Sequence, residues 1–315
     1  MIRYFDAHSD TLSRILRLRA SGEHADFKDS ELLNNNLNNL IAGGVKCQSF
    51  AIFVPPYYDQ EDQWNFALKQ VNLFKTEILS HPEIVHITDL KRIDEIPDDK
   101  IGALLTLEGC TAIARDLWKL ELLISEGVKI LSLVWNEENS CADGIMSARG
   151  AGVSDFGKEV INLCNKNNVI MDVSHISVNG FYDVVKLADK VIASHSNAKV
   201  ICHHPRNLDD NQIKALIEKG GIIHNVFTPP FVAEYEGERF YGTASIDDVI
   251  KHVKHIISLG GINNLAIGTD FDGIENYVTG LENSSKMQNY LTALQDEFGD
   301  QIAQNIAINN FMKLA

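Results

Sequence analysis

The chain contains no cluster of basic residues. Its 28 Lys and Arg are outnumbered by 43 Asp and Glu, which leaves a formal net charge of −15 at pH 7 over 315 residues. The acidic residues are spread along the sequence and form no tail. Binding to nucleic acid needs localised cationic surface for the phosphates. We therefore expect no nucleic-acid partner.

Long apolar runs and targeting signals are also missing. No stretch reaches the roughly 20 apolar residues that a bilayer-spanning helix needs. The first residues, MIRYF, show neither a positively charged leader nor an apolar signal segment, and the last, NNFMKLA, show no anchor tail. We expect a cytoplasmic protein that makes no contact with a membrane.

Cysteine is scarce and scattered. The five cysteines are odd in number and have no C-x-x-C spacing: Cys47, Cys110, Cys141, Cys164 and Cys202. This pattern is typical neither of a disulfide framework nor of a cysteine zinc site. We expect reduced thiols that are mostly buried.

Short apolar, β-branched runs recur along the whole chain. They predict eight strands, at residues 2–8, 45–54, 101–109, 128–135, 169–175, 191–196, 221–227 and 265–273. Helical segments lie between most of them, at residues 63–80, 111–127, 154–168, 209–220 and 245–260. Alternating strands and helices favour a parallel sheet, and eight such units favour closure into a barrel. Since no Gly/Pro/Ser-rich linker divides the chain, we predict an α/β fold, a single (β/α)8 TIM-like barrel that spans residues 1–315 as one domain.

Polar side chains follow these strands at the end where barrel enzymes build their active sites. In the segment FDAHSDTL, His8 and Asp10 are two residues apart, so they project together from the end of the first strand. Four other strands end in Glu108, His175, His195 and Asp270. Each of these residues alone could be a hydrogen-bonded structural group. Together they are the types that bind hard and borderline metals, and they predict a metal site.

The ligand set also indicates how many metal ions are bound. Three histidines with two or three carboxylates exceed the needs of one tetrahedral zinc. Two ions about 3.5–4 Å apart require a bridging carboxylate, a role we expect for Glu108. Such a pair lowers the pKa of a bridging water and polarises a carbonyl or phosphoryl oxygen, and Asp270 is placed to accept and return the proton. We therefore predict two divalent ions per chain.

The remaining histidines are weaker candidates. His203 and His204 are adjacent, so their side chains point apart, and His224 lies inside a predicted strand as a core or supporting residue. We expect the others to be solvated: His24, His81, His86, His252 and His255.

Two segments after the second and seventh strands are rich in aromatic residues, at 55–64 and 228–242. In a barrel both leave the C-terminal ends of strands, so they are candidates for pocket walls or lids. A contact between subunits is an equal alternative for each.

Several longer motifs resemble the membrane (renal) dipeptidase family of zinc peptidases, within the amidohydrolase superfamily. The resemblance runs through nearly all of the chain, and its motifs stand in family order: DAHSDTL (6–12), GGVKCQSFA (43–51), LTLEG (105–109), LSLVWNEENSCADG (131–144), MDVSHIS (171–177), ASHSNAKVICHHPRNLDD (193–210), IGTDFDG (267–273) and NNFMKL (309–314). It implies a zinc-dependent dipeptidase on a (β/α)8 barrel, in a family where homodimers are common.

The resemblance also implies roles for individual residues. Five of them match the family's ligands to two zinc ions, with the glutamate as the bridge: His8, Asp10, Glu108, His175 and His195. Asp270 matches the catalytic aspartate. Arg206, eleven residues after His195, matches the arginine that holds the C-terminal carboxylate of the substrate.

One position departs from the family pattern. Mammalian members carry a histidine that contacts the scissile carbonyl, twenty-seven residues after the bridging glutamate, and this chain has Trp135 there, followed by Asn136. An indole donates one hydrogen bond but does not become cationic. We expect both residues to contact the substrate and Trp135 to alter its selection. We also expect a protein without the secretion signal and lipid-anchor tail of the mammalian forms.

The sequence therefore predicts a binuclear zinc metallopeptidase that hydrolyses short dipeptides with a free C-terminal carboxylate. L,D-dipeptides are among the candidate substrates. One alternative is another amidohydrolase reaction, on an N-acyl amino acid, a lactone or a phosphoester, because this metal core serves many chemistries. The other is a metal-binding protein that has lost catalysis. Arg206 argues against neutral substrates, and the complete ligand set with Asp270 argues against lost catalysis.

Overall fold

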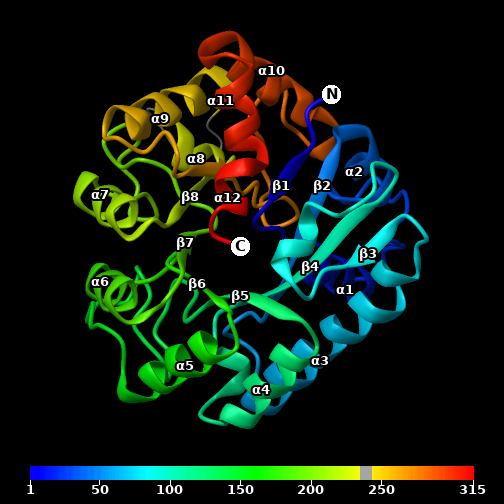
Figure 1. The fold of residues 1–315 in the computed structure, drawn as a ribbon. Coiled ribbons are helices and arrows are strands. Elements are labelled where there is room, and N and C mark those ends of the chain that lie inside the picture. Colours follow the sequence, from blue (N-terminus) through cyan, green and yellow to red (C-terminus); the bar gives the residue numbers. More distant parts are fainter. Residues whose placement is uncertain (235–242) are drawn as a thin grey trace.

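The computed structural model describes residues 1–234 and 243–315. Eight parallel strands form a barrel at the centre of the molecule (Figure 1): β1 Tyr4–Asp6, β2 Val45–Phe53, β4 Ile101–Glu108, β5 Val128–Ser132, β6 Ile170–Asp172, β7 Val191–Ala193, β8 Ile222–Asn225 and β9 Leu265–Ile267. They follow the order β2-β1-β9-β8-β7-β6-β5-β4, and pairing of β2 with β4 closes the barrel. The predicted TIM-like barrel is confirmed.

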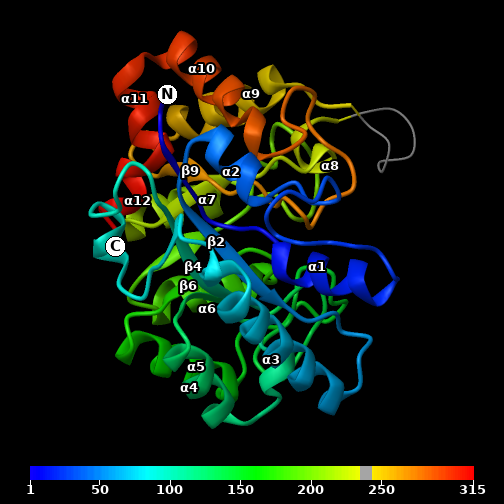
Figure 2. The same cartoon turned by 90° about the vertical axis from the view of Figure 1, so that its right-hand side faces the viewer.

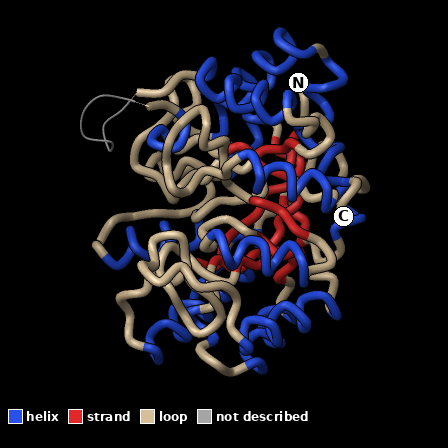
Figure 3. Tube along the Cα trace, turned by 90° about the vertical axis from the view of Figure 1, so that its left-hand side faces the viewer, coloured by secondary structure: helices blue, strands red, loops and turns tan. Residues whose placement is uncertain are grey.

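Helices surround the strands on the outside (Figures 1 and 3). They are α1 Thr11–Ala20, α2 Leu37–Gly43, α3 Gln60–Thr76, α4 Leu117–Ser125, α5 Asp155–Lys166, α6 Val178–Leu187, α7 Asp210–Lys219, α8 Pro229–Val232, α9 Ile246–Ser258, α10 Met287–Phe298, α11 Asp300–Gln304 and α12 Asn310–Met312. Short turns of 3-10 or π geometry complete them: η1 Ile78–Ser80, η2 Leu90–Ile93, η3 Thr111–Ile113, η5 Ser284–Lys286 and η6 Asn305–Asn309.

Several elements differ from the prediction, and helices such as α1, α6 and α10 lie outside the predicted helical ranges. The helix expected over 111–127 is divided into η3 and α4, because Ala114 has a φ of 53° that a right-handed helix does not admit. A further strand, β3 Ile84–His86, pairs in parallel with the first half of β4, outside the barrel. Its three residues are too few to show a periodic apolar pattern.

Several strands end earlier than predicted, and the reason bears on the site. The structure ends β9 at Ile267 and β6 at Asp172. Beyond them, Asp270 and His175 adopt left-handed backbone conformations, with φ of 63° and 71°. Such residues do not continue a strand. Asp270 and His175 therefore stand on tight turns beyond the sheet, whereas Glu108 is the last residue of β4.

The barrel interior is filled from the end opposite the site. Apolar side chains from the strands pack there against the C-terminal helices, and the rings of Phe5 and Phe311 stack with centroids 3.9 Å apart. Figure 2 shows α12 at one end of the barrel and α1 and α8 at the other. In Figure 3 long connections gather at the end away from the C-terminus.

All five cysteines are free and buried, as predicted. Among the helices of residues 1–234 and 243–315, none is long and apolar enough to cross a bilayer.

Candidate active site

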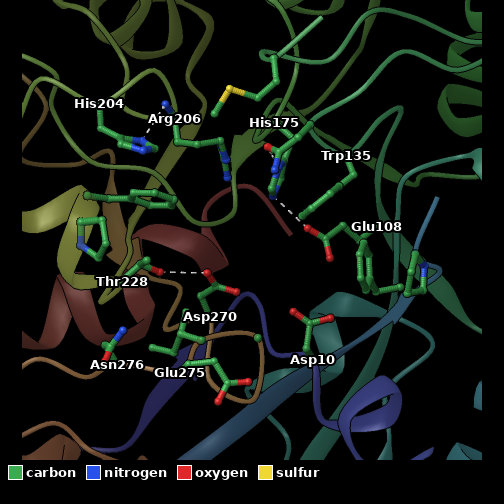
Figure 4. A pocket seen from close by; sticks show the side chains of 18 of the residues that line it. Asp10, Glu108, Trp135, His175, His204, Arg206, Thr228, Asp270, Glu275 and Asn276 are labelled. Carbon is green, nitrogen blue, oxygen red and sulfur yellow. Dashed lines mark hydrogen bonds and ion pairs between the residues drawn. The ribbon is translucent and has the colours of Figure 1, made fainter. Parts of the chain in front are cut away.

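The six side chains predicted at strand ends meet at one end of the barrel. Figure 4 shows Asp10, Glu108, His175 and Asp270 directed towards a common space. The Nε2 atom of His8 lies 3.6 Å from Asp10 Oδ2 and 3.9 Å from Asp270 Oδ1. Two overlapping groups of side chains could hold a metal ion, one made of His8, Glu108 and His195 and one made of His8, Asp10 and Asp270.

The two carboxylate oxygens of Glu108 face different partners. Oε2 lies 3.5 Å from Nε2 of His8. Oε1 lies 3.0 Å from Nε2 of His175 and 3.8 Å from Nε2 of His195. The carboxylate thus stands between two sets of donors, as last residue of a strand that is buried along its whole length.

Neighbouring residues accept hydrogen bonds from the Nδ1–H groups of His175 and His195, the two histidines on the Oε1 side. Nδ1 of His175 lies 2.8 Å from Asn136 Oδ1, which can only accept, so Nδ1 carries the proton. Ser194 Oγ donates to Asp172 Oδ2 at 2.5 Å and therefore accepts from His195 Nδ1 at 2.7 Å. The two Nε2 atoms, 2.8 Å apart, then face each other with lone pairs, and a cation bound between them would relieve that repulsion. Burial lowers the pKa of both imidazoles well below the usual range and keeps them neutral, as metal ligands must be.

The other side of the cluster also fits a cation. His8 Nε2 and Asp10 Oδ1 are buried without a hydrogen-bond partner, although buried polar atoms are normally satisfied. Burial disfavours a charged His8, yet the carboxylates of Glu108, Asp10 and Asp270 outweigh it and raise the pKa of His8 to about 10. The site therefore attracts positive charge. Imidazole and carboxylate donors without a thiolate suit zinc and related divalent ions.

The turn after β9 presents Asp270. Thr228 Oγ1 donates to Asp270 Oδ2 at 2.9 Å, which leaves Oδ1 on the side of His8. Burial raises the pKa of Asp270 to about 6, against the lowering effect of His8. A Cβ at Gly273 would lie 2.3 Å from Asp10 Oδ2 and 2.7 Å from Asp270 Oδ1, so the turn needs glycine at this position.

A pocket of about 760 Å³ opens above the cluster. Arg206 is buried in its wall, and Figure 4 shows its side chain directed at the same space as the acidic groups. Burial lowers the pKa of Arg206 to about 10, and its guanidinium lies over the Phe231 ring at 5.7 Å. Its Nε has no hydrogen-bond partner, and no carboxylate of the described residues forms an ion pair with it. A buried charge is normally paired, so a guanidinium without an ion-pair partner favours the binding of an anionic group in the pocket.

The two aromatic segments form walls of this pocket. Pro55, Pro56 and Tyr57 line it from one segment, and Thr228, Pro229, Pro230 and Phe231 line it from the other. Part of the second predicted segment, 235–242, lies outside the described residues. The predicted role as a pocket wall is thus confirmed for residues 55–57 and 228–231.

Trp135 and Asn136 also line the pocket, where the sequence places them. The Trp135 ring lies 5.4 Å from that of Phe53 and 5.9 Å from that of His175. The contact of Asn136 with His175 was not expected. His204 lines the pocket as well, and its Nδ1 accepts from the backbone N–H of Arg206 at 3.2 Å.

The prediction of a solvated His252 is wrong. This side chain is fully buried, accepts from the N–H of Ala198 at 3.1 Å and donates to the carbonyl of Val232 at 2.8 Å. His252 faces inward from α9, towards the connection after β7 and the end of α8. The sequence alone does not show this orientation.

Sequence reasoning missed the residues that support the ligands. Asp172 lies three residues before His175, and Ser194 lies directly before His195. Thr228 is distant in sequence from Asp270, its partner. Only the D-x-S-H pattern at 172–175 offered a signal, and it does not reveal that Asp172 supports the other histidine.

Comparison with known proteins agrees with this geometry. The sequence model of the membrane dipeptidase family (peptidase family M19) matches residues 1–315. An uncharacterised dipeptidase of Schizosaccharomyces pombe is 29% identical over 301 residues, which cover 89% of this chain and 71% of that protein.

Solved structures share the fold. A metallopeptidase from Rhodobacter sphaeroides, bound to a phosphinate mimic of the dipeptide L-Ala-D-Ala, superposes with a TM-score of 0.90 at 25% identity, covering 99% of this chain and 98% of that one. The probable dipeptidase PvdM of Pseudomonas aeruginosa gives a TM-score of 0.87 at 18% identity, covering 99% and 94% of the two chains, and shows the likeness of fold alone.

Proposed function

Because the chain belongs to the membrane dipeptidase family and is a metallodipeptidase, we propose that it holds two zinc ions and hydrolyses dipeptides with a free C-terminal carboxylate. The orientation of Glu108 carries the two-ion proposal, since its two oxygens face separate sets of donors. On this proposal His8 and Asp10 bind one ion, His175 and His195 bind the other, and Glu108 bridges them. The nitrogen and oxygen donors favour zinc.

Each remaining residue then has a defined task. Zinc held by these residues would supply activation of a water molecule and polarisation of the scissile carbonyl. Asp270 accepts a proton at Oδ1 and returns it to the leaving amine, while the Thr228 hydroxyl holds Oδ2 in place. Divalent ions held beside Asp270 would lower its pKa and favour the ionised carboxylate that a general base needs.

Arg206 supplies the selection for two-residue substrates. A guanidinium meets a carboxylate with two parallel charge-assisted hydrogen bonds. A longer peptide would instead place a neutral amide against a desolvated cation, which is unfavourable. The ligand of the Rhodobacter sphaeroides enzyme, a mimic of L-Ala-D-Ala, supports dipeptides with a D-residue at the C-terminal position as substrates here.

Metal analysis tests the bridging role of Glu108. The purified wild type should contain close to two divalent ions per chain, and Glu108→Ala should lose at least one of them and nearly all activity. Glu137→Ala, which removes an exposed glutamate outside the pocket, should keep both ions and full activity. Unchanged metal content in Glu108→Ala would contradict a bridge.

A substrate panel tests the carboxylate clamp. Relative to free dipeptides, dipeptide amides should lose about 2–4 kcal/mol in kcat/KM, and tripeptides should be poor substrates. Arg206→Ala should erase most of this difference by damaging the free dipeptide selectively, and Arg206→Lys should restore part of it. Equal cleavage of amides by the wild type would favour a broader amidohydrolase reaction.

A further inference from the structure

A second arginine faces the same pocket. Arg17, in α1, lines the pocket, and its Nε is buried without a hydrogen-bond partner. The two other arginines of the helix are paired with carboxylates, Arg14 with Glu275 at 2.8 Å and Arg19 with Glu77 at 2.8 Å. Throughout the described part of the chain, no carboxylate forms an ion pair with Arg17.

This lack of a partner stands out in an acidic protein. The sequence has 43 acidic residues against 28 basic ones, yet two arginines that line the pocket form no ion pair with a carboxylate of the described residues. Arg206 is one, and its counterion is the C-terminal carboxylate of the proposed substrate. The Arg17 guanidinium therefore has room for a second anionic group of a bound molecule.

The positions of the two arginines indicate which group that is. Arg206 follows β7 and Arg17 follows β1, and β8 and β9 lie between these strands in the barrel. Arg17 comes seven residues after Asp10, which corresponds to about 10 Å along the axis of α1, and both residues line the same pocket. A dipeptide that extends from Arg206 across the cluster directs its N-terminal residue to the side of Arg17.

We propose that Arg17 is a specificity-determining residue that selects dipeptides with an acidic side chain, Asp or Glu, on the N-terminal residue. The proposal rests on the dipeptidase function proposed above and names its substrate class. Bidentate hydrogen bonds between the guanidinium and the side-chain carboxylate provide the discrimination. The pocket also has apolar lining residues, Pro55 and Ile274 among them, and apolar surroundings strengthen such a pair.

Isosteric substrates separate this effect from the attraction of the zinc ions for any anion. Glu-D-Ala and Gln-D-Ala have nearly the same shape and differ in one charge, and Ala-D-Glu and Ala-D-Gln make the same comparison at the C-terminal position. For the zinc-loaded wild type, kcat/KM for Glu-D-Ala should exceed that for Gln-D-Ala by about tenfold or more. The C-terminal pair should differ much less.

Variants of α1 assign the preference to one residue. Arg17→Met removes the charge but keeps much of the side-chain length, and the Glu/Gln ratio should fall to about one. Arg17→Lys should keep part of the preference. Arg19→Met makes the same change of charge two residues away, outside the pocket, and should keep both the ratio and the activity of the wild type.

The outcomes separate the two proposals. Cleavage of all these dipeptides without a Glu/Gln difference would overturn the role of Arg17 and leave the dipeptidase function standing. A preference that survives in Arg17→Met, or one that depends on Arg17 but acts at the C-terminal residue, would also overturn it. Failure of the zinc-loaded wild type to cleave any dipeptide would overturn both proposals.

Discussion

Ser194 and Asp172 orient His195 through two consecutive hydrogen bonds, from Nδ1 to Oγ at 2.7 Å and from Oγ to Oδ2 at 2.5 Å. Asp172 also accepts from the backbone N–H groups of Ser174 and Ser194 through Oδ1. One carboxylate thus holds the turn after β6 and the residue before His195. At the residue scale, the geometry of a ligand depends on groups that do not face the cluster.

Asp172→Asn should weaken zinc binding about 10–100-fold, because an amide that donates to Ser194 Oγ reverses the hydrogen bond to His195. Competition with a chromogenic chelator measures the affinity. Ser194→Ala should weaken binding similarly, and the double variant should be little worse than either, since both act through one path. Fully additive losses of zinc affinity would contradict a single path of hydrogen bonds from Asp172 through Ser194 to His195.

Trp135 contacts the pocket through its ring, and its indole N–H has no hydrogen bond with any residue in the described ranges. Trp135→Phe should therefore change which dipeptides are preferred while kcat on the best one stays within about tenfold. Steady-state kinetics at known metal content measure this. A loss of about a thousandfold in kcat would instead identify the indole as a hydrogen-bond donor to the oxyanion.

At the scale of elements, α9 is tied to two loops of the site through His252. The ring joins the helix to Ala198, in the connection that leads to Arg206, and to Val232, at the end of α8. The bond from the Ala198 N–H requires an unprotonated Nδ1, so the imidazole is neutral and carries its proton on Nε2. Burial lowers the pKa of His252 to about 4, although the hydrogen bond to the Val232 carbonyl acts in the opposite direction.

Protonation of His252 should destabilise the fold in mild acid. The unfolded chain titrates this group at about 6.5, so the stability it contributes is present above that pH and is lost as the pH falls towards 4. Between about pH 7.5 and about pH 5 the loss should be about 2 kcal/mol. Urea unfolding at both values should show a smaller pH dependence for His252→Gln than for the wild type.

His24→Gln is the matched control, because the side chain of His24 is 93% exposed. Comparing variants at each pH cancels the contribution of the metal ligands, which titrate in all of them. The same pH dependence in His252→Gln and in the wild type would show that His252 titrates normally in the folded state.

For the whole molecule, stability and chemistry are divided between the two ends of the barrel. Phe311 is fully buried at the end opposite the site and stacks on Phe5. Phe5 belongs to β1, two residues before Ala7 and three before His8. The stacked rings of Phe5 and Phe311 therefore support β1, the strand that precedes His8 and Asp10. Neither ring lines the pocket.

Phe311→Ala should lower the free energy of unfolding by about 3–5 kcal/mol, because it leaves a cavity in a packed interior. The folded fraction should keep its kcat, since the change lies at the far end of the barrel. Chemical denaturation and activity at low temperature measure the two effects. Met312→Ala, at a partly buried neighbour, should lose clearly less stability.

The sequence by itself determined the architecture and the members of the cluster. Apolar periodicity is a local property, so strands such as β4 and β8 are readable from a few residues, and the order of strands and helices then implies the barrel. Because parallel strands of a barrel end on one face, Glu108 and His195 could be placed together from the ends of their strands. Motifs such as DAHSDTL strengthened this prediction.

Only the tertiary structure decided how these residues are held. Thr11 and Asp272 form a hydrogen bond of 2.6 Å across 261 residues of sequence, and Asp172 supports His195 and not the nearer His175. The burial of His252 and the unpaired state of Arg17 likewise depend on which side chains other elements bring nearby. Such contacts join segments that follow no shared local pattern, so they exist only once the barrel has closed.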